Sequence, residues 1–177
     1  MNDQKLKKIL LAVLPYWAPV LPPVGLSRLK SFLQPHGCDV KVVDLIVKNE
    51  ALEFYYNYFD VLKQCIPEEK RGNFKNIGHD VLRNHMMAHL HYNDEKRYIE
   101  LVKILIYKSY YVRVDDVYIR QLNEILTTYY CILKEYFLFL LEFEEPDVVG
   151  ATVYRDTIAP TLFVLKLTKK NIPISRP

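Results

Sequence analysis

Two uninterrupted apolar stretches of strand length constrain the fold of this chain most. They are residues 8–14 (KILLAVL) near the N-terminus and residues 148–154 (VVGATVY) near the C-terminus. Such stretches are typical of strands that are buried on both faces of a parallel sheet. Glycine is scarce, at 5 of 177 residues, which argues against an all-β chain with many hairpins. The sequence therefore predicts an α/β protein.

The first 49 residues predict a strand, a helix and a second strand. After the first strand, a helix is expected from Val24, with one apolar stripe formed by Leu26, Leu29, Phe32 and Leu33. Pro35 and Gly37 end it. Residues 39–45 (DVKVVDL) alternate and are β-branched, which predicts a second strand. A strand, a crossover helix and a strand form a βαβ unit, so the sheet is expected to be parallel.

The last 32 residues repeat this order. The strand over 148–154 and a polar turn over 155–157 lead to a helix over 158–170 with an inward stripe of Ile158, Leu162, Leu165 and Leu167. Residues 172–174 then resemble the start of a fourth strand. The prediction is a Rossmann-like, flavodoxin-like parallel sheet that is incomplete, since such sheets typically have five or six strands.

A helical insertion separates the two parts. Helices are predicted over 50–64, 81–90, 98–110 and 117–145, so the chain divides into residues 1–49, an insertion of 96 residues over 50–145, and residues 146–177. In the first predicted helix Leu52, Tyr55, Tyr56, Phe59 and Leu62 lie at helical spacing. The net charges of the three segments are +4, −4 and +3. Insertions of this length inside a compact domain are usually functional.

Composition excludes several classes of protein. The net charge of +3 gives no sign of nucleic-acid binding. The cysteines Cys38, Cys65 and Cys131 are odd in number and lack CxxC spacing, which argues against a disulfide framework. No apolar segment has the length of a membrane span, and no signal peptide is evident. A soluble, cytoplasmic protein that does not contact a membrane is expected.

The loop after the first strand is the strongest candidate for a ligand site. Residues 15–23 (PYWAPVLPP) contain four prolines, which favour a stiff extended loop. It contains Tyr16 and Trp17 and precedes Gly25 at a helix start. Ligands of open α/β sheets bind beyond the carboxyl ends of the strands, so this loop predicts a flat apolar wall there. It lacks the glycine pattern and the N–H donors of a phosphate loop. The alternative is a loop that only packs against the insertion.

These segments resemble a known family. The residues PPVGL (22–26), HGCDVKVVD (36–44) and PDVVGATVY (146–154) are similar to the N-terminal cobalamin-binding domain of cobalamin-dependent radical S-adenosylmethionine enzymes. Some members of that family carry a long insertion in this domain. The resemblance implies a doubly wound domain that holds cobalamin against the carboxyl ends of its strands, beside a radical domain in cis or in trans.

The resemblance also implies a set of cofactor-binding residues. They are Tyr16, Trp17, Pro22, Pro23, Gly25 and Leu26 along the lower face of the corrin, with Thr152 and Tyr154 near the nucleotide tail. The chain departs from the family in three features. It has no DxHxxG motif in the loop over 15–25, no glycine pair after a fourth strand, and no CxxxCxxC motif for a 4Fe-4S cluster. The cluster and S-adenosylmethionine are thus expected only in a downstream domain, and this chain is expected to be a non-catalytic, truncated module.

Histidines in the insertion form a second candidate cluster. His85 and His89 are four residues apart on a predicted helix, a spacing at which two imidazoles can bind one metal ion. The segment HMMAH lacks the glutamate of HExxH, which excludes that metalloprotease motif. A packing role within the insertion is favoured, and no metal ligand is assigned.

Two other functions remain open from the sequence. The chain could be a helical interaction or scaffold protein with a vestigial α/β part, or a small flavodoxin-like enzyme. The absence of a phosphate loop weakens the enzyme hypothesis.

Overall fold

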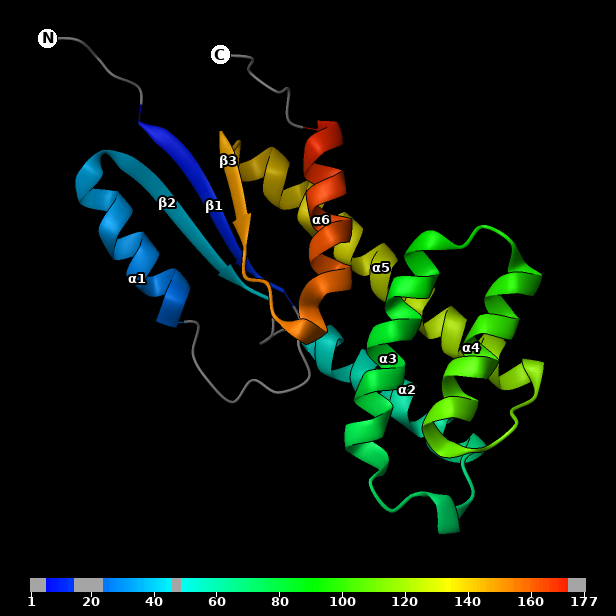
Figure 1. The fold of residues 1–177 in the computed structure, drawn as a ribbon. Coiled ribbons are helices and arrows are strands. Elements are labelled where there is room, and N and C mark those ends of the chain that lie inside the picture. The colour runs from blue at the N-terminus through cyan, green and yellow to red at the C-terminus, as the bar shows by residue number, and fades with distance from the viewer. Residues whose placement is uncertain (1–5, 15–23, 46–48, 172–177) are drawn as a thin grey trace, which may run out of the picture. The chain divides into compact units, whose positions relative to one another are not determined.

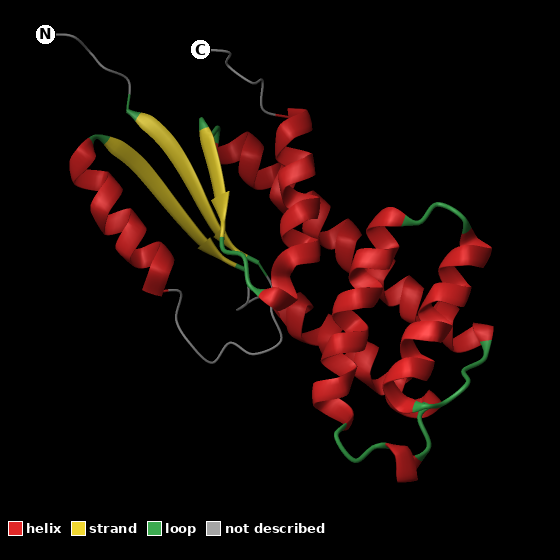
Figure 2. Ribbon diagram, in the orientation of Figure 1, coloured by secondary structure: helices red, strands yellow, loops and turns green. Residues whose placement is uncertain are grey.

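The computed structural model describes residues 6–14, 24–45 and 49–171. In chain order the main elements are β1 (Lys7–Val13), α1 (Val24–Leu33), β2 (Cys38–Asp44), α2 (Asn49–Cys65), α3 (Phe74–His91), α4 (Glu95–Tyr110), α5 (Asp116–Glu144), β3 (Val148–Ala151) and α6 (Ile158–Asn171). Three short 3-10 helices, η1 (Gln34–His36), η2 (Glu68–Lys70) and η3 (Arg155–Thr157), lie between them. Figures 1 and 2 show these elements. The predicted α/β class, with a large helical segment between the second and third strands, is confirmed.

The chain forms two compact units. One consists of Met1–Lys48 and Ile132–Pro177 and is called the sheet unit here, and the other is Asn49–Cys131, the helical unit. The boundary falls inside α5. Residues 132–144, which the sequence places in the insertion, therefore belong to the sheet unit.

The sheet is parallel, with strand order β2-β1-β3. Ile9 of β1 aligns with Val40 of β2 on one side and with Val148 of β3 on the other. At the start of β3 the backbone N–H of Asp147 donates to the carbonyl oxygen of Lys8 (2.8 Å), and a carboxylate oxygen of Asp147 accepts from the backbone N–H of Lys8 (2.9 Å). The third strand is shorter than predicted, because it ends at Ala151.

Helix α1 covers one side of the sheet, but fewer of its apolar side chains face the sheet than the sequence predicts. Leu26 is buried, and Leu33 packs against the same core. Leu29 and Phe32 are exposed, so their predicted place in the inward stripe is wrong. The Phe32 ring instead stacks on His36, with 4.5 Å between ring centroids. The core beneath α1 consists of Leu11, Val13, Leu26 and Val40.

Helix α6 faces the sheet with the opposite side from the one predicted. Ile158, Leu162 and Leu165 are 37%, 39% and 40% exposed. The buried residues of α6 are Ala159, Pro160, Thr161 and Val164. Their side chains are short, which lets the helix lie close to the sheet. Figure 1 shows α6 and the last part of α5 on the side of the sheet opposite α1.

The helical unit packs α2, α3, α4 and the first part of α5 around an apolar core. Tyr58 is completely buried although it lies outside the predicted stripe of α2, and Tyr56, inside that stripe, is 61% exposed. Helix α3 begins at Phe74, seven residues before the predicted start at Val81. The fully buried apolar side chains of this core include Tyr58, Leu62, Ile66, Val81, Val102, Ile106, Ile119, Leu122 and Leu126.

One glycine is required for this packing. A Cβ atom on Gly78 of α3 would lie 2.6 Å from Cε1 of Phe59 and 3.1 Å from the hydroxyl oxygen of Tyr110. Such a separation is far below van der Waals contact, so α3 approaches its neighbours closely only because residue 78 lacks a side chain.

Acidic residues start two of the helices. The Asp94 side chain accepts from the backbone N–H of Arg97 (2.9 Å) and caps α4. Asp116, the first residue of α5, pairs with Lys103. This pairing lowers the pKa of Asp116 and raises the pKa of Lys103. A carboxylate at the first residue of α5 also interacts favourably with the positive end of the helix dipole.

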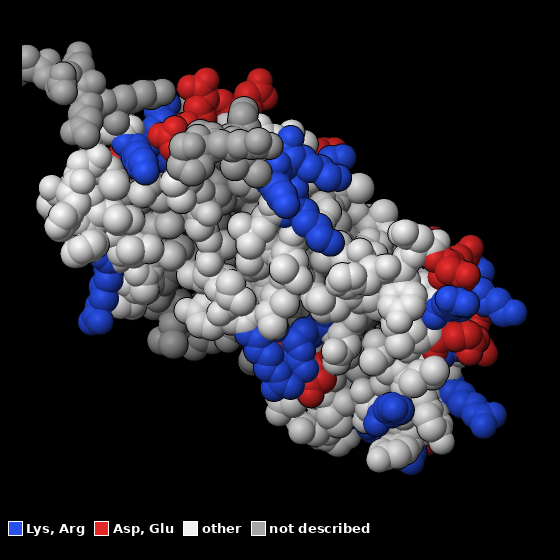
Figure 3. Space-filling model, turned by 45° about the horizontal axis from the view of Figure 1, so that its top comes forward, with Lys and Arg blue, Asp and Glu red and all other residues white. Residues whose placement is uncertain are grey.

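Among the described residues, no helix is long and apolar enough to cross a membrane. On the face drawn in Figure 3, uncharged residues predominate, and blue and red side chains lie beside one another at several places.

Candidate functional site

The carboxyl ends of β1 and β3 form the candidate ligand site of the sheet unit. From β1 the chain first passes to β2 on one side and later returns to β3 on the other. Such a reversal defines a switch point, and open α/β sheets bind ligands in the crevice beyond it. The expected position of the site, after the first strand, thus coincides with the switch point of the described sheet.

The structure places some of the predicted site residues. Gly25 is the second residue of α1, and a Cβ atom there would meet no atom within 4 Å. Leu26 is 6% exposed and lies in the core beneath α1, so its side chain stabilises the helix. The predicted residues Tyr16, Trp17, Pro22 and Pro23 lie outside the described residues.

Thr152 directly follows β3 and has an unusual environment. Its backbone N–H donates to the carbonyl oxygen of Ala12 (3.0 Å), which fixes it beside the end of β1. Its hydroxyl oxygen is buried and has no hydrogen-bond partner among the described residues. A buried hydroxyl without a partner costs about 1–3 kcal/mol. Such a group at a switch point is well placed to bind a polar atom of a ligand.

Threonines fix the turn that presents Thr152 and Tyr154. The Thr157 hydroxyl oxygen accepts from the backbone N–H of Tyr154 (2.9 Å) and lies 3.4 Å from the carbonyl oxygen of Thr152. The Thr161 hydroxyl lies 3.5 Å from that same oxygen. Thr157 and Thr161 are both buried. The Tyr154 side chain is 58% exposed, so it is accessible to a ligand or to solvent.

Sequence reasoning missed Thr157 as a structural residue. The sequence predicts a short polar turn at residues 155–157, whereas the Thr157 side chain is completely buried. The N-cap here is Tyr154 and the residue three positions later is a threonine, so the usual capping-box pattern of Ser or Thr followed by Glu or Gln is absent from the sequence.

A buried hydrogen-bond network surrounds the two histidines of the helical unit. His85 Nδ1 lies 2.8 Å from the Tyr58 hydroxyl, and His85 Nε2 is bonded to the Tyr98 hydroxyl. The Tyr98 hydroxyl donates to Asn123 Oδ1 (2.8 Å), and His89 Nδ1 lies 2.8 Å from the same oxygen. The five side chains come from α2, α3, α4 and α5, so the network ties all four helices together.

The direction of the hydrogen bonds follows from the number of protons available. A hydroxyl has one proton, so Tyr98, which donates to Asn123, must accept the proton of His85 Nε2. His85 is then neutral, with Nδ1 accepting from Tyr58. The amide oxygen of Asn123 also accepts from His89 Nδ1. Every donor between Tyr58 and Asn123 therefore has an acceptor.

Burial accounts for the protonation state of His85. Desolvation, with repulsion from His89 as a smaller cause, lowers the pKa of His85 to about 3. Burial also raises the pKa of Tyr58 and Tyr98 above the usual value for tyrosine. All three groups are neutral at physiological pH, which fits a structural network.

No metal site accompanies the histidines in the described ranges. Within residues 6–14, 24–45 and 49–171, no three His, Cys, Asp or Glu side chains come together as a metal-binding group. His85 and His89 instead contact Tyr58, Tyr98 and Asn123, as expected for the packing role favoured by the sequence. Tyr58 and Asn123 were not identified from the sequence, although Tyr58 lies four residues before Leu62 on the buried face of α2.

Comparisons with protein-family models, with curated proteins and with solved structures find no match for this chain.

Proposed function

We propose that the sheet unit binds cobalamin at the carboxyl ends of β1 and β3, as a non-catalytic module that works beside a radical S-adenosylmethionine domain in cis or in trans. The proposal combines the family resemblance of the sequence with the position of one side chain. In it the sheet is the first part of a flavodoxin-like domain, to which the order β2-β1-β3 is suited.

The observation that carries the proposal is the buried Thr152 hydroxyl without a described partner. A fold gains nothing from such a group, because its desolvation is not repaid by a hydrogen bond. A bound cofactor would repay it. Cobalamin offers many acceptors and donors on the amides of its corrin and on its nucleotide tail, so it can supply a partner for this hydroxyl.

The remaining roles follow from the chain's own residues. Tyr154, on the exposed part of the same turn, would contact the cofactor with its ring, while Thr157 and Thr161 hold the turn in place. Gly25 would allow a close approach, because a Cβ atom there would meet no described atom within 4 Å. Bound cobalamin would supply methyl-transfer or rearrangement chemistry in the complete enzyme.

Titration with hydroxocobalamin, followed by its visible spectrum, tests the proposal. Binding to the protein is expected to shift the visible spectrum of hydroxocobalamin, and the shift should saturate as the titration proceeds. Thr152→Val should weaken binding about two- to tenfold, the effect of losing one hydrogen bond. A matched control is Tyr129→Phe, which removes another buried hydroxyl without a described partner, in the helical unit.

Each outcome has a clear meaning. Weaker binding in Thr152→Val with unchanged binding in Tyr129→Phe supports the proposal. An unchanged spectrum at saturating cofactor, or equal effects of the two substitutions, contradicts it.

A second function is favoured by one feature of the helical unit. Ile104, Tyr107 and Tyr111 lie three and four residues apart along α4 and its end, and all are between 46% and 73% exposed. An apolar, aromatic stripe of this kind is typical of protein-interaction surfaces. If the cobalamin titration fails, a role as a helical interaction protein becomes the better hypothesis, and substitution of these residues by serine would test it in a partner capture experiment.

A further inference from the structure

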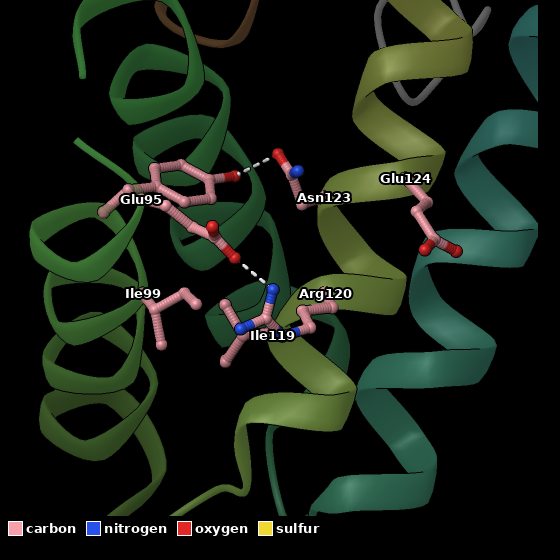
Figure 4. Close-up of a pocket in the computed structure, with 7 residues that line it drawn as sticks. Glu95, Ile99, Ile119, Arg120, Asn123 and Glu124 are labelled. Atoms are coloured by element: carbon pink, nitrogen blue, oxygen red, sulfur yellow. Dashed lines mark hydrogen bonds and ion pairs between the residues drawn. The ribbon is translucent and has the colours of Figure 1, made fainter. Parts of the chain in front are cut away.

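A small pocket lies between the first turns of α4 and α5 in the helical unit. Its volume is about 170 Å³. Figure 4 shows Glu95 and Ile99 on α4 facing Ile119, Arg120 and Asn123 on α5. The pocket is independent of the proposed cofactor site, because all of its residues belong to the helical unit.

An ion pair lies at the exposed part of the pocket. The Arg120 guanidinium pairs with the Glu95 carboxylate, and their side chains are 57% and 67% exposed. Exposed pairs of this kind contribute only about 0–1 kcal/mol. An incoming anion can therefore replace Glu95 as the partner of Arg120 at little cost.

The hydrogen-bond network leaves a donor group at the pocket. Asn123 Oδ1 accepts from both Tyr98 and His89, each at 2.8 Å, which fixes the orientation of the amide. The amide nitrogen of Asn123 then has two N–H groups that donate to no described residue. A ligand in this pocket meets a neutral donor and an exchangeable cation, which together favour an acceptor that carries negative charge.

The remaining lining limits the size and polarity of the ligand. The side chains of Ile99 and Ile119 are buried and apolar. Glu124 also lines the pocket, but Figure 4 shows its carboxylate on the far side of α5 from Arg120. Pockets for drug-sized ligands are larger, at roughly 300–1,000 Å³, so only a small ligand fits.

We propose that this pocket binds a small branched monocarboxylate. The carboxylate is held by the Arg120 guanidinium and by the amide N–H groups of Asn123. The short aliphatic part of the ligand lies against Ile99 and Ile119. Glu95 competes with the ligand for Arg120 and so keeps the affinity low.

The probe for this proposal is sodium isobutyrate, titrated against the full chain and followed by the amide resonances in two-dimensional NMR. Saturable shifts at residues of the first turns of α4 and α5 are expected. Isobutyramide, which has the same shape without the charge, should bind much more weakly. Sodium chloride at equal ionic strength controls for a salt effect.

Three substitutions on the surface separate the contributions. Arg120→Gln should abolish saturable binding, while Glu95→Gln should strengthen it about two- to fivefold by removing the competitor. Glu100→Gln is the matched control, because it removes one negative charge from α4, the helix of Glu95, at a residue that does not line the pocket, and should leave the affinity unchanged.

The proposal has definite contrary results. No saturation with isobutyrate in either the original chain or Glu95→Gln overturns it. Equal binding of isobutyramide, tighter binding of isobutylamine, or an affinity that does not depend on Arg120 also overturns it.

Discussion

The two units of this protein treat their buried polar groups differently. In the helical unit, His85 is completely buried and both of its ring nitrogens are bonded. In the sheet unit, the Thr152 hydroxyl is buried beside the ends of β1 and β3 and has no described partner. Tyr129 is an exception in the helical unit, since its hydroxyl also lacks a described partner. The comparison indicates that hydrogen-bonded polar side chains hold the helical unit together, whereas the Thr152 hydroxyl makes no such contribution within the described residues.

Of the substitutions considered, His85→Leu should lower the free energy of unfolding most, because it removes the centre of the hydrogen-bond network of the helical unit. It leaves the buried Tyr58 hydroxyl without its His85 partner, at a cost of about 1–3 kcal/mol, and removes one of the two hydrogen bonds of the Tyr98 hydroxyl, which keeps its bond to Asn123. The free energy of unfolding should fall by about 3 kcal/mol, measured by urea denaturation followed by circular dichroism. His91→Leu, at an exposed histidine of the same helix, should change it by less than about 0.5 kcal/mol. Equal losses in the two variants would show that the network contributes nothing.

Alanine substitutions at two glycines, Gly78 in the helical unit and Gly25 in the sheet unit, compare how closely the two units pack. Alanine at Gly78 gains helix propensity but meets Phe59 and Tyr110, so Gly78→Ala should destabilise the protein by about 2 kcal/mol. Gly25→Ala meets nothing within 4 Å and should stabilise it by about 0.5 kcal/mol. Thermal unfolding of both variants tests this. The packing argument fails if Gly78→Ala melts at or above the temperature of the original chain.

The pH dependence of stability tests the neutral state of His85. In the unfolded chain histidine titrates near pH 6.5, whereas in the folded chain burial lowers the pKa of His85 to about 3. Below about pH 6.5 the unfolded state therefore binds a proton that the folded state does not. Stability should fall as the pH decreases from about 6.5 toward about 3, with a slope of up to about 1.4 kcal/mol per pH unit from this group. Above that range His85 adds no pH dependence.

Urea denaturation at several pH values gives the slope. His85→Gln should make the slope shallower, although that variant is less stable at every pH. His91→Gln should not reduce the slope contributed by His85. An unchanged slope in His85→Gln would mean that His85 is not the group that titrates.

The smallest expected effect concerns Thr152. Thr152→Val removes a hydroxyl without a described partner and keeps the shape of the side chain, so it should raise the free energy of unfolding by about 1 kcal/mol. Thr157→Val removes a hydroxyl that has partners and should lower it. Together with weaker cobalamin binding by Thr152→Val, a gain in stability would indicate a group that is retained for binding. A loss of stability would show that the Thr152 hydroxyl has a structural partner.

The sequence predicts the elements of the fold better than their orientation. Apolar stretches and helical spacing place β1, α1, β2, α2, α4, α5 and α6 within a few residues of their observed bounds. Periodicity alone misassigns the buried side of α6. Residues 158–165 carry one stripe of large apolar side chains and another of small ones, and close packing selects the small one.

The start of α3 was missed for a related reason. Gly78 weakens the helix signal before residue 81, because glycine has low helix propensity. The reason for a glycine there is the contact with Phe59, a residue of another helix. A contact between distant residues leaves no local pattern in one sequence.

The two candidate sites also differ in whether local sequence patterns or contacts between distant residues determine them. The switch point after the first strand can be predicted from the order of the elements, since it depends on topology. The hydrogen-bond network of His85 could not be predicted from the sequence. Its members Tyr58, Tyr98 and Asn123 belong to three different helices, and none of them stands out within its own segment.

The position of β3 also determines the order in which this protein can assemble. Its pairing with β1 joins Lys8 to Asp147, residues that are 139 positions apart, whereas the helical unit consists of 83 consecutive residues. Contacts between distant residues form slowly, and those within helical bundles form quickly. At a synthesis rate of roughly 5–20 residues per second, Lys8 of β1 emerges from the ribosome roughly 7–28 s before Asp147 emerges. During that time the apolar edge of β1 lacks its partner, so the newly made chain is most exposed to misassociation while the helical unit is already able to fold.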